Sequence, residues 1–489
     1  MRKIISLIMA MCLFLSLAAC TPNDTPTESP THTPTEAPSG PVLEPTESNS
    51  GTKAWYQIYV KGFYDSDGDG IGDLGGVVQK LIYISELGYD GVILMPISPS
   101  DEYHGKDATD LCAIDSTVGS ENSLRALVSA ANDIGITVIV DLGLSSTFRS
   151  YPDFESANES IKSILNYWLC ECGVDGFRLT DMASYYFEDE KNIEAITQLV
   201  TEIRNISTDA YVLGDLAISD DKAISAYYAT GIDSIQIFTN ADATGSLASS
   251  LKIHNGGVLG ELFKTMDEVY GDNIITTYIS SDSTSNRTAS YMSGLENIKM
   301  ITALQMICSG SVITYYGDEI GMVSPNAGAN ESAKYSSMKW TDSTDSDGYC
   351  FNSPAQESGA SYIYSSQQKQ AQDDTSIYSF YKDLLYLRSC LPSICAGKTQ
   401  YIELENNRAI CLMTKTYGDE TVTVVVNLAS PTSESDENAG VREVSLSGEE
   451  LDFDGVVAVL NAYDSGFGCE YNADTGVLTI PPYSIVVLK

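Results

Sequence analysis

Eight short runs of β-branched and aromatic residues recur between residues 56 and 316 of this 489-residue chain, and helical patterns separate them. Leu124, Leu127, Val128, Ala131 and Ile134 have the spacing of one helix face and lead directly into the third run. The runs cover residues 56–60, 92–97, 137–144, 176–179, 211–213, 234–238, 275–279 and 312–316. Their number and spacing predict an (α/β)8 TIM barrel, with a doubly wound open sheet as the alternative.

The pattern changes after residue 396. Runs that alternate apolar and polar residues cover 421–427, 442–446, 456–460 and 477–488, and glycine-containing turn signals lie among them. Alternation is typical of antiparallel strands with one buried face. We therefore expect the barrel over residues 52–396 and a C-terminal antiparallel β-sandwich domain over residues 397–489.

The N-terminus has the organisation of an export signal. Arg2 and Lys3 precede an apolar run that ends in Leu-Ala-Ala-Cys at Cys20. These features predict a signal peptide over residues 1–19 and an exported chain. The ending resembles a bacterial lipobox, which implies a lipid on Cys20 and a cell-surface lipoprotein held on the outer side of a bacterial membrane. An unmodified secreted protein is the alternative.

The segment that follows Cys20 has the composition of a spacer. Residues 21–51 hold seven of the sixteen prolines together with Thr, Ser and Glu, and they contain neither Lys nor Arg. Such a segment has little apolar surface to bury, so it stays extended. We expect residues 20–51 to be a lipid-anchored, disordered linker between the membrane and the barrel.

The charge of the chain limits its partners. Sixty-seven acidic and 27 basic residues give a formal net charge of −40, which repels phosphate backbones. Nucleic acid is therefore excluded as a partner. Nine cysteines remain besides Cys12 and Cys20, an odd number without a zinc-type spacing, and we interpret most of them as buried hydrophobic residues.

An acidic loop after the first run has the spacing of a cation site. Asp65, Asp67, Asp69 and Asp73 alternate with small residues, and the carbonyl of Ile71 adds a further oxygen. Ca²⁺ prefers such hard oxygen ligands at alternate positions of a loop. The sequence therefore predicts a Ca²⁺ site that stiffens the loop, with a metal-free acidic turn as the alternative.

Several motifs together resemble the α-amylase family of glycoside hydrolases. They are YQIY (56–59), DSDGDGIGDL (65–74), HGKD (104–107), GVDGFR (173–178), YYGDEIGM (315–322) and FYKDL (380–384). The resemblance implies the same barrel and C-terminal β domain, and an α-glucan or related oligosaccharide as ligand. It also implies substrate-binding roles for His104, Asp107, Asp141 and Arg178.

The same resemblance indicates altered catalytic positions. Family members use an Asp nucleophile, a Glu acid/base and a second Asp at strand ends. The nucleophile position here is Thr180, the acid/base position is the shorter Asp215, and the third carboxylate has only an approximate equivalent in Asp282. Asp181 follows Thr180, and strand alternation predicts that it points away from the pocket unless the strand end bulges.

Three further departures accompany these changes. Lys106 replaces a tyrosine of the family pattern, and Ser145 and Ser146 replace an Asn-His pair. The family's inserted domain after the third strand is reduced to residues 145–158, which predicts a shallow cleft. We therefore expect an α-glucan-binding protein with little or no hydrolysis. The alternatives are an α-glycosidase with a rearranged nucleophile and a non-catalytic scaffold or transporter accessory that binds a protein partner.

Overall fold

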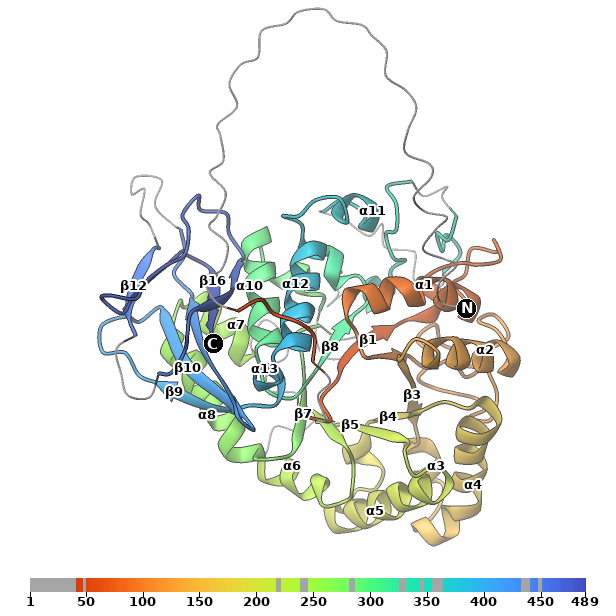
Figure 1. Ribbon diagram of the computed structural model, residues 1–489. Coiled ribbons are helices and arrows are strands. Elements are labelled where there is room, and N and C mark those ends of the chain that lie inside the picture. The colour runs from red at the N-terminus through yellow and green to blue at the C-terminus, as the bar shows by residue number, and fades with distance from the viewer. Residues whose placement is uncertain are drawn as a thin grey trace, which may run out of the picture. The chain divides into compact units, whose positions relative to one another are not determined.

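Eight parallel strands form a closed barrel in which each strand pairs with the next along the chain and β8 pairs with β1. The computed structural model thus confirms the (α/β)8 barrel rather than the open sheet (Figure 1). Every predicted run is a strand, with ends that differ from the prediction by up to three residues. The strands are β1 (Ala54–Ile58), β2 (Gly91–Leu94), β3 (Thr137–Gly143), β4 (Gly176–Thr180), β5 (Tyr211–Asp215), β6 (Ser234–Gln236), β7 (Ile274–Tyr278) and β8 (Ser311–Tyr315).

The structure describes most of the chain beyond the N-terminal segment. The described residues are 41–46, 50–216, 221–237, 245–280, 286–324, 331–343, 347–353, 364–431, 440–446 and 451–489. They belong to one compact unit, Pro38–Lys489. The predicted signal peptide, Cys20, most of the linker and Asp282 lie outside the described residues. In the described part of the chain, no helix combines the length and the apolar character needed to cross a bilayer.

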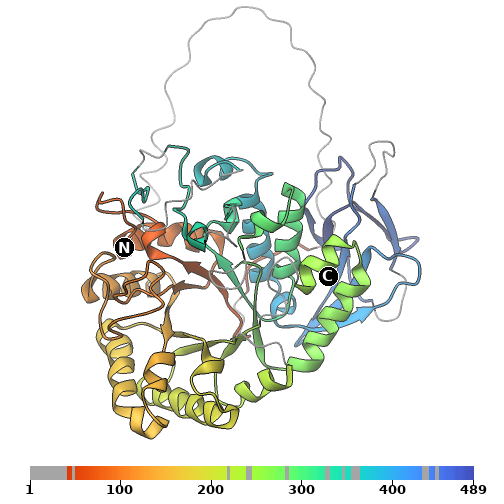
Figure 2. The ribbon, with the colours of Figure 1, turned by 180° about the vertical axis from the view of Figure 1, so that it is seen from behind.

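Helices alternate with the strands and surround the barrel (Figure 2). In α2 (Glu121–Asn132) the bounds follow from the sequence, because Ser120 and Ser123 exchange side-chain hydrogen bonds with each other's backbone N–H groups. The predicted face of α2 is buried except for Ile134, which lies after the helix end and is 38% exposed. The other helices are α1 (Leu74–Leu87), α3 (Ser145–Arg149), α4 (Phe154–Asn166), α5 (Asp189–Ile206), α6 (Asp221–Tyr228), α7 (Ser246–Lys252), α8 (Gly256–Tyr270), α9 (Thr288–Tyr291), α10 (Leu295–Met306), α11 (Gln367–Gln370), α12 (Ile377–Cys390) and α13 (Pro392–Ala396).

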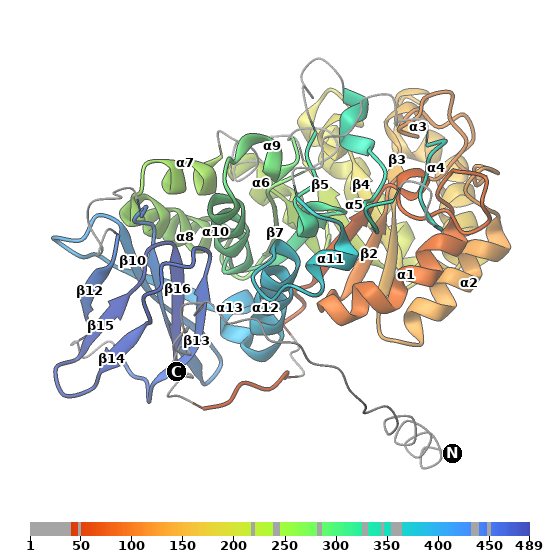
Figure 3. The same ribbon diagram turned by 90° about the horizontal axis from the view of Figure 1, so that it is seen from above.

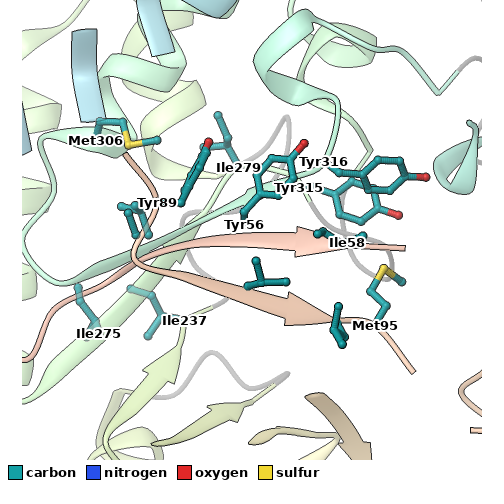
Figure 4. Packing of buried hydrophobic residues seen from close by; sticks show 14 of the residues in the cluster. Tyr56, Ile58, Tyr89, Met95, Ile237, Ile275, Ile279, Met306, Tyr315 and Tyr316 are labelled. Carbon is teal, nitrogen blue, oxygen red and sulfur yellow. The ribbon is translucent and has the colours of Figure 1, made fainter. Parts of the chain in front are cut away.

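Alternate side chains of the barrel strands enter two separate apolar layers. One layer lies between strands and helices and includes Tyr56, Ile58 and Ile275 (Figure 4). The other layer, which we call the lumen plug, fills the barrel interior; it consists of Trp55, Ile93, Ile139, Leu213, Tyr278 and Ile313, each at most 2% exposed. Gly91 makes room for this plug, because a Cβ there would lie 2.3 Å from the Trp55 ring. The interior is therefore a packed core, as in other barrels of this type.

A buried carboxylate fixes the turn that follows β8. Glu319 lies in a 3-10 turn, Asp318–Ile320, and is 0% exposed. Its Oε1 accepts hydrogen bonds from the hydroxyls of Tyr56 at 2.6 Å and Tyr83 at 2.7 Å, and its Oε2 accepts the Gly317 N–H at 2.8 Å. Burial raises the pKa of Glu319, and these hydrogen bonds oppose the rise. The turn is thereby tied to both β1 and α1.

Two antiparallel sheets follow α13, as predicted (Figure 3). Their orders are β13-β16-β11-β10-β9 and β12-β15-β14. The prediction of one run over 477–488 is wrong, because Pro481 and Pro482 cannot donate ladder hydrogen bonds and separate β15 from β16. The strands are β9 (Lys398–Ile402), β10 (Ile410–Tyr417), β11 (Glu420–Asn427), β12 (Arg442–Ser445), β13 (Val456–Asn461), β14 (Glu470–Asn472), β15 (Val477–Ile480) and β16 (Ser484–Leu488).

The inner strands of the five-stranded sheet are buried on both faces. On β10, Ile410 and Leu412 join a core with the smaller sheet, whereas Cys411 and Met413 join the core that continues into the barrel helices. A backbone hydrogen bond also joins the β domain to the barrel helices: the Gly256 N–H at the start of α8 donates to the Arg408 carbonyl at 2.8 Å. The β domain is thus packed onto the barrel.

Candidate functional site

A polar layer lies next to the lumen plug, toward the carboxyl ends of the strands. Asp141 follows Ile139 by two residues on β3, and Asp215 follows Leu213 by two residues on β5. Residues two apart on a strand point to the same side. Arg178 of β4 lies opposite Asp141 in the strand register. Three adjacent strands therefore bring two carboxylates and a guanidinium together.

Arg178 is the centre of this layer. Its Nη1 donates to Asp141 Oδ2 and its Nη2 to Asp215 Oδ2, both at 2.7 Å, and its Nε donates to Gln236 Oε1 at 2.9 Å. The side chains of Arg178 and Asp141 are each 2% exposed, while that of Asp215 is 21% exposed. A planar guanidinium holds several acceptors in fixed directions. The position of both carboxylates is therefore set by one buried cation.

A pocket of about 430 Å³ lies at this layer. It brings together six of the predicted site residues: Asp107, Asp141, Arg178, Thr180, Asp181 and Asp215. The segments that follow β3 and β4 supply further lining residues: Ser145, Ser146 and Arg149 belong to α3, and Ser184 belongs to the turn after β4. The connection after β3 is short, since α3 begins two residues after the end of β3 and α4 follows at Phe154.

Thr180 is the last residue of β4 and lines the pocket beside Gly143 of β3. A hydroxyl therefore stands where the resemblance places a nucleophilic carboxylate. A hydroxyl attacks carbon only when an adjacent base removes its proton. Within the described residues, the Thr180 hydroxyl forms no hydrogen bond with a carboxylate or a histidine.

Asp181 has an unusual backbone conformation at the end of β4. The residue leaves the strand with φ 51° and ψ 32°, in the left-handed region that a non-glycine residue rarely adopts. It is exposed and lines the same pocket as Asp215. Strand alternation therefore stops at Thr180, which is the kind of irregular strand end that the prediction for Asp181 left open.

Tyr185 lies within electrostatic range of both acidic residues. Its side chain is 0% exposed, and its ring stacks on Phe148 with centroids 4.7 Å apart. Burial raises the pKa of Tyr185, and the charges of Asp181 and then Asp215 raise it further. Tyr185 therefore stays neutral beside these two acidic residues.

His104, also predicted to bind substrate, is not among the residues that line the pocket. It is half-buried, its ring packs edge-on against Tyr103, and its Nδ1 accepts the Lys106 N–H at 3.1 Å. Lys106 and Asp107, from the same motif, do line the pocket and are exposed.

Two residues of the site were missed by sequence reasoning. Gln236 could have been found from strand alternation, because it follows the inward-facing Ser234 by two residues on β6. Arg149 ends α3 and lines the pocket, while its Nε and Nη2 both donate to the Ser184 carbonyl, at 3.1 and 2.7 Å. No periodic pattern marks Arg149, since its position depends on the loop after β3.

The acidic loop brings three of its predicted ligands together. Carboxylate oxygens of Asp65, Asp67 and Asp73 lie within 4.8 Å of one another. Asp69 stands outside this group, and its Oδ1 accepts the Ile71 N–H at 2.7 Å. Asp65 also accepts the N–H groups of Gly68 and Gly70, each at 2.7 Å, which gives the loop its shape. Three hard anionic oxygen donors at this spacing fit a divalent cation such as Ca²⁺.

Comparisons with known proteins agree with this architecture. Alpha-amylase 3 of Dictyoglomus thermophilum is 27% identical over 439 residues, which cover 76% of this chain and 84% of that protein. The 4-alpha-glucanotransferase of Thermotoga neapolitana is 24% identical over 386 residues, or 66% of this chain and 84% of that protein. Among solved structures, Eubacterium rectale Amy13B superposes with a TM-score of 0.80 at 25% identity, covering 91% of this chain and 97% of that chain.

The family profile described as "Alpha amylase, catalytic domain" matches residues 57–159 and 143–397. This match extends over more than half of the sequence and includes the whole barrel from the end of β1 to α13. The chain belongs to the alpha-amylase family of glycoside hydrolases.

Proposed function

We propose that this protein binds α-glucan oligosaccharides in the pocket beside Arg178 and hydrolyses them little or not at all. The relatives described above are an alpha-amylase and a 4-alpha-glucanotransferase, which supports an α-glucan as the ligand. Carboxylates, a guanidinium and hydroxyls line the pocket and offer both acceptors and donors for sugar hydroxyl groups.

The observation that carries the loss of hydrolysis is the end of β4. Thr180 stands there with no carboxylate or histidine among the described residues hydrogen-bonded to its hydroxyl, and the Asp215 carboxylate already accepts a charge-assisted hydrogen bond from Arg178. Asp is also one methylene shorter than the Glu expected from the resemblance, and a displacement on the order of 1 Å costs about a hundredfold in rate. Both the nucleophile and the acid/base are therefore compromised.

A second candidate function, an α-glycosidase with a rearranged nucleophile, is favoured by the placement of Asp181. This carboxylate lines the same pocket as Asp215, and both influence the hydroxyl of Tyr185. A retaining hydrolase requires two carboxyl groups about 5 to 5.5 Å apart across the bond to be cleaved. In this scheme Asp181 would attack the anomeric carbon and Asp215 would protonate the leaving oxygen.

Calorimetry with maltooligosaccharides, combined with a reducing-sugar assay, separates these functions. We expect measurable binding and a turnover at least on the order of 10³-fold below that of an active family member, because a lost acid or base alone costs 10²–10⁴. The conservative variant Asp181→Asn should then leave the residual rate unchanged. Thr180→Val, which alters the other residue at this strand end, serves as the matched control.

The other possible results of these binding and turnover measurements each favour a different function. Turnover that Asp181→Asn abolishes and Thr180→Val preserves would establish the glycosidase. Absence of binding and of turnover would contradict both sugar functions and leave the protein-binding scaffold. A covalent glycosyl adduct on Asp181, detected by mass spectrometry of the digested protein, would contradict the non-hydrolytic proposal directly.

We also propose that Asp65, Asp67 and Asp73 hold a Ca²⁺ ion that stiffens the loop between β1 and α1. Addition of Ca²⁺ to chelator-treated protein should raise the melting temperature by a few degrees, because a ligand present at a hundred times its Kd stabilises by about 2.7 kcal/mol. Asp67→Asn should abolish this response, since it removes the charge of the exposed ligand and keeps the oxygen that accepts the Asp69 N–H.

Asp110→Asn is the matched control for the calcium experiment. Asp110 is also exposed and also accepts a backbone N–H two residues ahead, that of Cys112. This variant should respond to Ca²⁺ like the unaltered protein. Equal responses in Asp67→Asn and the unaltered protein would show that the acidic loop is not the site of binding.

The cellular location forms part of the same proposal. We propose that the chain is exported and anchored through a lipid on Cys20, as residues 1–20 indicate. The pocket would then meet oligosaccharides outside the bacterium. The mass of the mature N-terminus tests this, because a diacylated Cys20 and an unmodified secreted chain differ by the mass of the lipid.

A further inference from the structure

Phe187 has the highest exposed fraction of the large hydrophobic side chains in the described part of the chain, at 91%. It lies in the loop between β4 and α5, directly after Tyr185 and Tyr186, which are 0% and 8% exposed. The loop thus buries two successive aromatic rings and leaves the third in solvent. Phe187 is therefore exposed even though the loop that carries it packs against the core.

The segment that carries Phe187 is held firmly. Asn192 of α5 is 1% exposed, and its Oδ1 accepts the Tyr186 N–H at 2.8 Å. Its Nδ2 donates to the Met182 carbonyl at 2.9 Å and to the Tyr227 hydroxyl at 3.1 Å. One buried amide therefore fixes both ends of the turn that precedes Phe187, so the phenyl ring is presented from a defined position.

Arg149 connects this ring to the pocket. Its guanidinium carbon lies 5.4 Å from the centroid of the Phe187 ring, within the range of a cation–π contact. The same guanidinium donates twice to the Ser184 carbonyl, and both Arg149 and Ser184 line the pocket. Phe187 is therefore separated from the pocket by a single side chain.

We propose that Phe187 is a stacking platform for a sugar ring of an oligosaccharide that extends out of the pocket past Arg149. This inference rests on the proposed sugar-binding function and identifies a further specificity-determining residue of that site. A phenyl ring offers a flat apolar face, and the C–H face of a glucosyl unit matches it while the sugar hydroxyl groups remain in water. Arg149 would position the ring and contribute N–H donors at the boundary between pocket and platform.

Such a platform lies outside the pocket, so it should affect long ligands more than short ones. Phe187→Ala should weaken the binding of maltoheptaose roughly tenfold, about 1.4 kcal/mol, and change the binding of maltose little. The melting temperature should stay unchanged, because the removed ring is almost fully exposed. Phe467→Ala, which removes an exposed phenyl ring (37%) from the β domain, is the matched control and should leave both affinities unchanged.

Fluorescence gives a second, independent test. The three tryptophans of the chain, Trp55, Trp168 and Trp340, are at most 5% exposed. An indole introduced by Phe187→Trp would therefore dominate quenching by acrylamide. Maltoheptaose should protect this indole from the quencher and should not protect the indole introduced by Phe467→Trp.

The outcomes distinguish this inference from the proposed function. If the unaltered protein binds maltoheptaose and Phe187→Ala binds it equally well, the platform is wrong and the sugar-binding pocket stands. The platform is also wrong if Phe187→Ala and Phe467→Ala weaken the binding of maltoheptaose equally. It is likewise wrong if saturating maltoheptaose does not protect the indole at position 187 from acrylamide. If the unaltered protein binds no maltooligosaccharide, both proposals fail together.

Discussion

Replacing Arg178 with methionine is expected to lower the free energy of unfolding by about 3–5 kcal/mol, the cost of removing one partner from a buried ion pair. The side chains of Arg178 and Asp141 are each only 2% exposed, and the guanidinium donates hydrogen bonds to Asp141, Asp215 and Gln236. Methionine fills much of the same volume but offers no donor. The loss, measured by denaturant unfolding at neutral pH, should therefore come from electrostatics rather than from a cavity.

A second substitution tests that cause. Asp141→Asn in the Arg178→Met background removes the buried negative charge and should recover part of the lost stability. Lys398→Met is the surface control: it breaks an ion pair with Asp272 at 3.0 Å whose side chains are 73% and 90% exposed, and stability should hardly change. An Arg178→Met protein as stable as the original would contradict the central place given to this cation.

Glu319→Leu should destabilise the barrel by about 3–9 kcal/mol, since it removes the acceptor of three donors, two of them buried, and each stranded group costs about 1–3 kcal/mol. The donors are the hydroxyls of Tyr56 and Tyr83 and the N–H of Gly317. Glu319→Gln keeps an oxygen that can accept both hydroxyls, so its loss should be smaller. Thermal and denaturant unfolding of the two variants give the comparison.

Removing the stranded hydroxyls tests the argument further. Tyr56→Phe and Tyr83→Phe, added to Glu319→Leu, delete the two donors that have lost their acceptor. The triple variant should then be more stable than Glu319→Leu alone, even though it carries more substitutions. If the added phenylalanines instead reduce stability further, unsatisfied hydroxyls are not the reason for the loss.

The barrel could be predicted from sequence because its strands are short, regularly spaced and separated by amphipathic helices. The β domain was predicted less completely: β9, β10 and β14 were missed. The case of β10 has a clear cause. Ile410 to Met413 are buried on both faces of the sheet, so the alternation that marks a half-buried strand is absent there.

The candidate site was predictable where it depends on strands and spacing, and less so where it depends on loops. Asp141, Arg178, Thr180 and Asp215 lie at the pocket because they occupy the inward positions of adjacent strands. The backbone conformation of Asp181 could not be predicted, since a single left-handed residue after the strand is not visible in a periodic pattern. Arg149 ends the short helix α3 and Phe187 lies in the loop after β4, and only the folded chain defines the course of these two segments.

The lumen plug determines how a sugar chain could move through this molecule. Trp55 and its five partners fill the interior along the barrel axis, so the interior is a packed core rather than a channel. A glucan cannot be threaded along the axis from one end to the other. If the protein binds α-glucans as proposed, the sugar reaches the site from the carboxyl ends of the strands, the side on which Arg149 lines the pocket.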